Sequence, residues 1–148
     1  MLLDTNLEIA DALSIAAAAG TAVLANAIDL SAAAFNPDGA EMYLVIQVTT
    51  AVTSAGAATV QFALVSDSTD PASTDGSETQ HWISKAIPKA TLVAGYTIIV
   101  PLPFGSPAYE RYLQLEVITG TATTTAGAIN AFLTTEPSLW RAYPQANN

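Results

Sequence analysis

The 148-residue sequence contains no cysteine. This absence excludes disulfides, thiolate nucleophiles and zinc sites built on cysteine. Basic residues are almost as scarce: the chain has four, at Lys85, Lys89, Arg111 and Arg141, against 13 acidic ones, for a net charge of −9. Nucleic-acid binding needs a cationic surface that displaces counterions from phosphates. The charge balance therefore predicts that the chain does not bind nucleic acid.

Long apolar runs are also missing. The most apolar window, residues 15–25, is about half as long as the roughly 20 residues that a membrane-spanning helix needs. The first eight residues carry Asp4 and Glu8 where a secretory signal would carry lysine or arginine. We therefore expect a soluble protein without a signal peptide and without a membrane partner.

Catalytic groups are few. His81 is the single histidine, and Ser84, the nearest serine after it, would point to the opposite face of a strand. No Gly-x-Ser-x-Gly motif is present, and the glycine-bounded segment 120–127 lacks the lysine of a phosphate-binding loop. The sequence predicts no enzyme, no catalytic residues and no cofactor.

An acidic segment spans residues 67–78 and contains Asp67, Asp70, Asp75 and Glu78. Carboxylates are suitable ligands for calcium, but their spacing does not follow the Asp-x-Asp-x-Asp-Gly pattern. The segment has no large apolar residue, so we interpret it as a loop in solvent and predict no metal site. The sequence alone leaves calcium binding by this loop open.

The residues that are abundant favour strands. The chain has 29 alanines and 18 threonines, and threonine occurs in runs with valine and isoleucine, which suit a pleated surface. The clearest pattern spans residues 111–135 and predicts a β-hairpin with a polar connector at 120–127. Apolar rows face the predicted core, and Gln114 and Glu116 are expected to face water; the rows are Leu113, Leu115 and Val117, then Ile129, Ala131 and Leu133.

Tyr112 and Phe132 fall on the face of this hairpin that is expected to be wet. Another segment covers them, they are ordinary exposed aromatics, or they contact another protein, and we retain both as interface candidates.

Further strands are predicted at 21–30, 42–49, 59–64, 81–87, 91–93 and 96–102, with a turn at Asn36–Gly39. Pro101 should end the last of these or place it at a sheet edge. About eight short strands without a helix between them predict an all-β fold, a single antiparallel jelly roll or β-sandwich over residues 21–135. An immunoglobulin-like sandwich is the alternative. Residues 1–20, helical or extended, form an N-terminal arm, and residues 136–148 form an extended C-terminal arm.

Both predicted arms carry residues suited to association. Trp140, Arg141 and Tyr143 are of types enriched at binding hot spots, and the N-terminal arm has Leu2 and Leu3. These side chains either pack on their own domain or reach a neighbouring subunit.

Several segments together resemble one family, the small jelly-roll capsid cement (decoration) proteins of tailed double-stranded DNA bacteriophages. The matching pieces are Met1–Thr5, Leu7-Glu8, Asp11-Ala12, Ile28–Leu30, Tyr43–Val48, Ala57–Phe62, Arg111–Leu115, Gly127 and Ala131–Leu133. They are spread over residues 1–135, whereas the tail from Glu136 does not match.

The resemblance implies a structural virion protein on the outer capsid surface, made in the host cytoplasm. It would bind seams between subunits of the major capsid protein and stabilise the shell. It would also form a homo-oligomer, with a dimer favoured over a trimer. The alternatives are a carbohydrate-binding jelly roll that uses Tyr96, Phe104 and Tyr109 as sugar platforms, or a phage fibre or adhesin domain.

Overall fold

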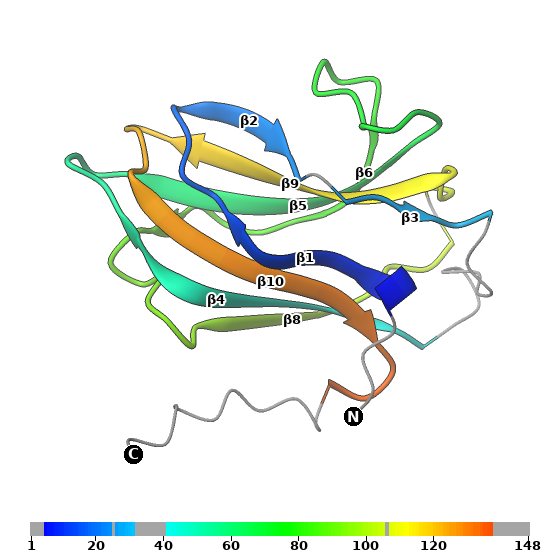
Figure 1. Cartoon of the computed structure of the whole chain (residues 1–148). Coiled ribbons are helices and arrows are strands. Elements are labelled where there is room, and N and C mark those ends of the chain that lie inside the picture. Colours follow the sequence, from blue (N-terminus) through cyan, green and yellow to red (C-terminus); the bar gives the residue numbers. More distant parts are fainter. Residues whose placement is uncertain (1–4, 25, 32–40, 106, 138–148) are drawn as a thin grey trace.

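The computed structural model of the chain describes residues 5–24, 26–31, 41–105 and 107–137 (Figure 1). Regular structure in this part consists of ten strands and one short 3-10 turn, η1 (Thr5–Leu7). The strands are β1 (Glu8–Ser14), β2 (Gly20–Val23), β3 (Ile28–Asp29), β4 (Tyr43–Thr53), β5 (Thr59–Asp67), β6 (Thr79–Ile83), β7 (Ile87–Pro88), β8 (Thr97–Pro101), β9 (Tyr112–Gly120) and β10 (Ala126–Thr134). Over these residues, the chain has no helix long and apolar enough to cross a membrane.

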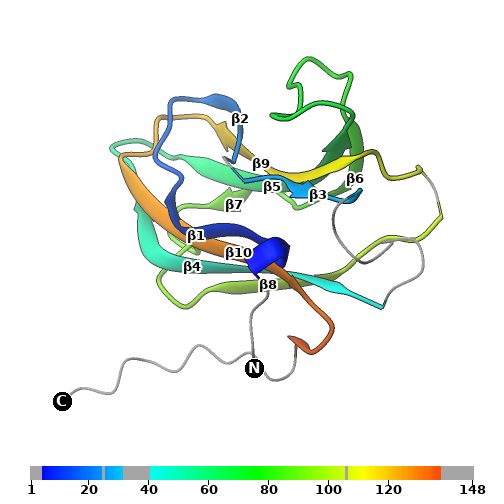
Figure 2. The same ribbon diagram turned by 45° about the vertical axis from the view of Figure 1, so that its right-hand side comes forward.

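The strands form two antiparallel sheets that pack face to face, as the two views in Figures 1 and 2 show. One sheet has the order β1-β10-β4-β8, and the other has the order β2-β9-β5-β6, with the short strands β3 and β7 pairing β9 and β5. The chain passes repeatedly from one sheet to the other, which is the strand order of a jelly roll. The predicted all-β sandwich is confirmed.

The core lies between the sheets and is lined by the apolar rows that the sequence predicts. Leu113, Leu115 and Val117 enter it from β9, and Ile129, Ala131 and Leu133 enter it from β10. The rows from β4 and β5 complete it with large aliphatic and aromatic side chains, among them Phe62 and Leu64.

The prediction of a hairpin over residues 111–135 is wrong. β9 pairs β2, β3 and β5, whereas β10 pairs β1 and β4, so the two strands belong to opposite sheets. The connector at 121–125 carries the chain across the edge of the sandwich. Both apolar rows still face one core, because each strand covers it from its own side.

The predicted N-terminal arm is also corrected over its described part. Residues 8–14 form β1, which pairs β10 at the edge of the four-stranded sheet. Its register shifts twice, and Ala12 has a φ of 45°, so the alternation of a regular strand is broken. Because these irregularities interrupt the two-residue period of a strand, the sequence pattern of this segment did not distinguish a helix from an extended chain.

Three smaller differences concern strand limits. The strand expected at 21–30 is divided into β2 and β3, the strand expected at 81–87 into β6 and β7, and residues 91–93 lie in a turn. The turn expected at 36–39 lies outside the described residues. β8 is an edge strand that ends at Pro101, as predicted.

Gly127 is required by the irregular start of β10. Its φ is +144°, and a Cβ atom there would lie 3.0 Å from Val52 Cγ2 and 3.1 Å from Ile15 Cγ1. We expect Gly127→Ala to lower the free energy of unfolding by about 1–3 kcal/mol, measured by urea denaturation. Gly105→Ala is the control, since Gly105 also has a positive φ but no atom lies within 4 Å of the added carbon. An equal effect of both substitutions would contradict the role of crowding at Gly127.

Candidate functional site

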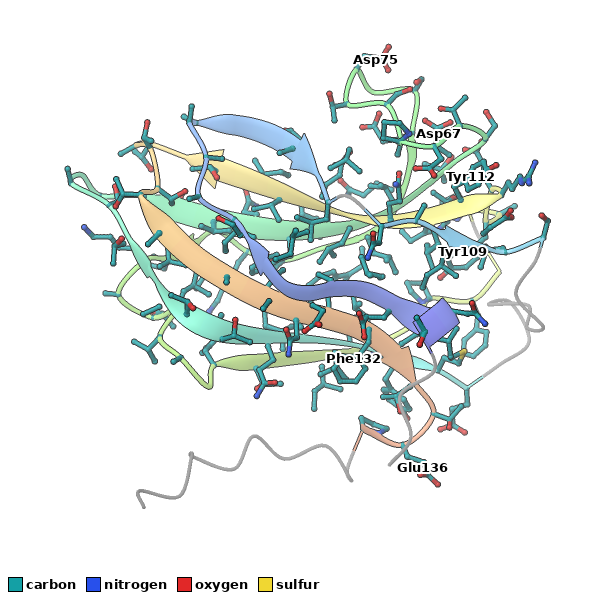
Figure 3. The ribbon with its side chains drawn as sticks, in the orientation of Figure 1. Asp67, Asp75, Tyr109, Tyr112, Phe132 and Glu136 are labelled. Atoms are coloured by element: carbon teal, nitrogen blue, oxygen red, sulfur yellow. The ribbon has the colours of Figure 1, made fainter. Side chains whose placement is uncertain are left out.

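The structure describes two of the predicted interface residues, Tyr112 and Phe132 (Figure 3). Phe132 is only 1% exposed, so its ring is not an open contact surface on this chain, which corrects the interpretation of Phe132 as an exposed aromatic. Tyr112 is half-buried at the start of β9. The remaining candidates, Leu2, Leu3, Trp140, Arg141 and Tyr143, lie outside the described residues.

Tyr112 lies beside a charged pair that connects β3 to β9. Arg111 Nη2 lies 2.9 Å from Asp29 Oδ2, and the guanidinium stands 4.8 Å from the centre of the Tyr112 ring. The hydrogen bond from Arg111, supported by Ser31, holds the pKa of Asp29 well below its usual range. The pair is largely exposed, so it orders this end of the sheet but contributes little to stability.

His81 contacts a serine that sequence spacing did not indicate. Ser66 Oγ on β5 lies 2.8 Å from His81 Nε2, and the backbone N–H of Glu110 donates to the same Oγ at 2.9 Å. The imidazole stacks on Tyr109 with ring centres 3.9 Å apart. Ser66 is fully buried, so this hydroxyl cannot reach a substrate. The contacts instead tie β5, β6 and the segment before β9 together.

The acidic segment 67–78 is not surrounded by solvent alone, because part of it packs and forms hydrogen bonds on the domain. Ala72 is buried against Ala63 and Val65 on the outer face of the six-stranded sheet. The Asp67 carboxylate accepts the backbone N–H of Ser73 at 2.8 Å and that of Thr69 at 3.2 Å. These bonds, Ser73 foremost, lower the pKa of Asp67 to about 2. We call residues 68–78 the covering loop, and Figure 3 shows it rising over one end of this sheet.

The carboxylates of this segment do not gather into a metal site. No group of three or more histidine or acidic side chains within the described part of the chain is placed to hold a metal ion. Asp67 and Asp75 instead accept hydrogen bonds from nearby loop residues. The geometry gives no support to calcium binding here.

Gln114 attaches the covering loop to β9, although the sequence pattern assigned this residue to water. Its Oε1 accepts the backbone N–H of Ala72 at 2.5 Å, and its Nε2 donates to Asp70 Oδ1 at 3.0 Å. The side chain is fully buried.

We expect Gln114→Leu to lower the free energy of unfolding by about 1–3 kcal/mol, because it leaves the buried Ala72 N–H without its acceptor. Hydrogen exchange should show faster exchange at Ala72 and Ser73, with strand amides unchanged. Gln61→Leu is the control, since Gln61 donates to Ser84 O, which lies outside the covering loop. Unchanged exchange at Ala72 would contradict the role of Gln114.

The other notable surface is the free side of β8, where apolar side chains are exposed. Val93 just before the strand is 53% exposed, Ile99 within it is 47% exposed and Phe104 just after it is 58% exposed. Among the described strands, β8 pairs only β4. Its other side therefore presents backbone groups without a strand partner, next to the exposed side chain of Ile99. We call residues 93–104 the β8 edge.

The β8 edge lacks the usual protection of an edge strand. Residues 90–109 contain no charged residue, in a chain of net charge −9. β1, at the opposite edge of the same sheet, carries Glu8 and Asp11. Charged side chains on an edge strand discourage pairing with another chain, and β8 has only Pro101 to limit it. This edge is the best candidate for an interface in the described structure.

The aromatic residues considered as sugar platforms are not gathered on one exposed surface. Tyr96 and Tyr109 pack against the core, and Tyr109 donates its hydroxyl to Pro103 O at 2.8 Å. Phe104 is the exposed member of the three.

A family model described as Bbp16 matches residues 9–133, which include every strand except the first residue of β1 and the last residue of β10. No curated protein matches the chain.

Proposed function

The chain belongs to the Bbp16 family, and from this premise we propose that it is a capsid cement protein of a tailed double-stranded DNA bacteriophage. It would bind the outer surface of the mature capsid at seams between major capsid protein subunits and stabilise the shell. The resemblance of several segments to jelly-roll cement proteins supports this role, as does the jelly-roll strand order.

The uncharged β8 edge is the observation that carries the proposal. Electrostatic repulsion between an acidic protein and another acidic surface is smallest where the protein presents an uncharged part of its own surface. A free strand can also add a segment of a partner by backbone hydrogen bonds, with Ile99 packing beside it. We propose that the β8 edge contacts the major capsid protein.

The stabilising effect would follow from selective binding. A protein that binds the expanded shell, but not its separated subunits, shifts the equilibrium toward the intact shell. An oligomer that engages more than one shell subunit gains further affinity because its second contact forms within one complex. We therefore propose a homo-oligomer, with a dimer favoured over a trimer, whose terminal arms add contacts at Leu2, Leu3, Trp140, Arg141 and Tyr143.

The first test is co-sedimentation of the purified chain with expanded capsids from which it has been stripped. Binding close to a fixed number of copies per shell, at micromolar concentration or below, is the expected result. A parallel glycan screen distinguishes the alternative: a folded chain that binds glycans and fails to sediment with capsids would replace the cement role by carbohydrate binding.

A further inference from the structure

Glu116 is the most unusual buried group on the outer face of the six-stranded sheet. It lies on β9 and is only 4% exposed, and its Oε1 atom has no hydrogen-bond partner. Its neighbours across the sheet are apolar, Ala63 on β5 and Val23 on β2. A carboxylate in such surroundings is costly, because neither water nor a donor stabilises the charge at Oε1.

The covering loop closes over this part of the sheet. Ala72 packs on Ala63 and Val65, and Val23 and Ile118 pack against the same small cluster. Glu116 is therefore enclosed by apolar side chains from two neighbouring strands and from its own strand. Gln114, two residues before it, holds the covering loop by two hydrogen bonds.

The charged group that acts on Glu116 is acidic, Glu78 of the covering loop. The same loop also contains Asp70 and Asp75, and β5 ends at Asp67, whereas β2 has no titratable group and β9 has none on this side within two residues of Glu116. No lysine or arginine of the described chain forms an ion pair with Glu116. Burial, with the nearby Glu78, raises the pKa of Glu116 to about 7.

We propose that the covering loop is a proton-controlled lid, closed over the sheet while Glu116 is protonated and released when Glu116 loses its proton. The neutral carboxyl fits the apolar enclosure, whereas the ionised carboxylate would be buried beside Glu78. Release brings water to Glu116 and exposes the apolar face formed by Val23, Ala63 and Val65. This inference does not depend on the capsid role.

The direction of the pH effect follows from the two states. The pKa of Glu116 is raised above its ordinary value of 4.5 in the closed state, so the closed loop binds the proton more tightly than the open loop. Closure is therefore fully favoured below about pH 4.5 and weakens as the pH rises toward 7. The closing equilibrium should change by up to about tenfold per pH unit in that window.

Hydrogen exchange of the full chain between pH 5 and pH 8 tests the proposal. After correction for intrinsic exchange, protection of the Ala72 and Ser73 amides should fall at least 30-fold between pH 5 and pH 7.5. Glu116→Gln, which mimics the protonated group, should remove this fall. Glu78→Gln should keep the fall but move its midpoint to lower pH, because a neighbouring negative charge has been removed.

Two results would overturn the proposal: protection at Ala72 that does not vary with pH in the wild-type chain, or the same decrease in Glu116→Gln. The carboxyl carbon of Glu116 supplies a direct check in the wild-type chain, whatever the folding of the variants. A titration midpoint above pH 6 in its NMR shift supports the lid, and a midpoint near 4.5 contradicts it.

Discussion

Ile99→Asp is expected to weaken binding to expanded capsids by about 100-fold or more. The substitution removes a 47% exposed apolar side chain from the centre of β8 and places an unpaired negative charge on an otherwise uncharged edge. Burying such a charge at an interface costs several kcal/mol, and loss of a central apolar contact adds to this cost. The dissociation constant from co-sedimentation measures the effect.

Thr21→Asp is the matched control for this prediction. Thr21 is an exposed residue of β2, an edge strand of the six-stranded sheet, so the substitution adds the same charge at a different edge. We expect its affinity to stay within about threefold of the wild type, because exposed rim charges act weakly. If both variants are folded and bind capsids with equal affinity, the β8 edge is not part of the interface.

Phe62→Ala is expected to lower the free energy of unfolding by about 3–5 kcal/mol. Phe62 is fully buried in the core between the two sheets, so truncation removes many contacts and leaves a cavity. Urea denaturation followed by tryptophan fluorescence measures the change. A loss of this size is a large part of the 5–15 kcal/mol that stabilises a typical domain.

Phe104→Ala makes the same chemical change outside the core. Phe104 is 58% exposed, and its truncation should alter the free energy of unfolding by no more than about 0.5 kcal/mol. Comparable losses for the two variants would contradict the burial difference between them. Because Phe104 belongs to the β8 edge, Phe104→Ala changes the proposed interface without a large loss of stability.

The core of this protein could be predicted from alternation alone. Leu113, Leu115 and Val117 occur at every second position, and a strand with that pattern buries one face wherever its partners come from. The position of Pro101 at the end of an edge strand could be predicted for the same kind of local reason, because proline cannot donate to a ladder.

Pairing between distant strands could not be predicted in this way. Alternation does not specify a partner, so β9 and β10 looked like one hairpin although each pairs strands from the first half of the chain. The short connector at 121–125 crosses between sheets without a distinctive residue pattern. The bulges of β1 hid its strand character for a related reason, since they interrupt the period of two.

Burial on the outer face depends on tertiary contacts that composition does not reveal. Gln114 and Glu116 follow a polar pattern typical of a wet face, yet both are buried, and the covering loop binds Gln114 directly. The residue that could have indicated this burial is Ala72, which packs on Ala63 and Val65. Alanine is so common in this chain that one more alanine in a polar segment predicts nothing. The sequence alone therefore does not indicate that Glu116 is a buried carboxyl group with a raised pKa.

The proposed stabilisation of the capsid is measured by the melting temperature of expanded shells stripped of this chain. Addition of the wild-type chain at saturating concentration should raise this temperature, because ligand binding to the intact shell alone stabilises it. Ile99→Asp at the same concentration should give a much smaller rise. A folded wild-type chain that leaves the melting temperature of the shells unchanged would contradict the cement role.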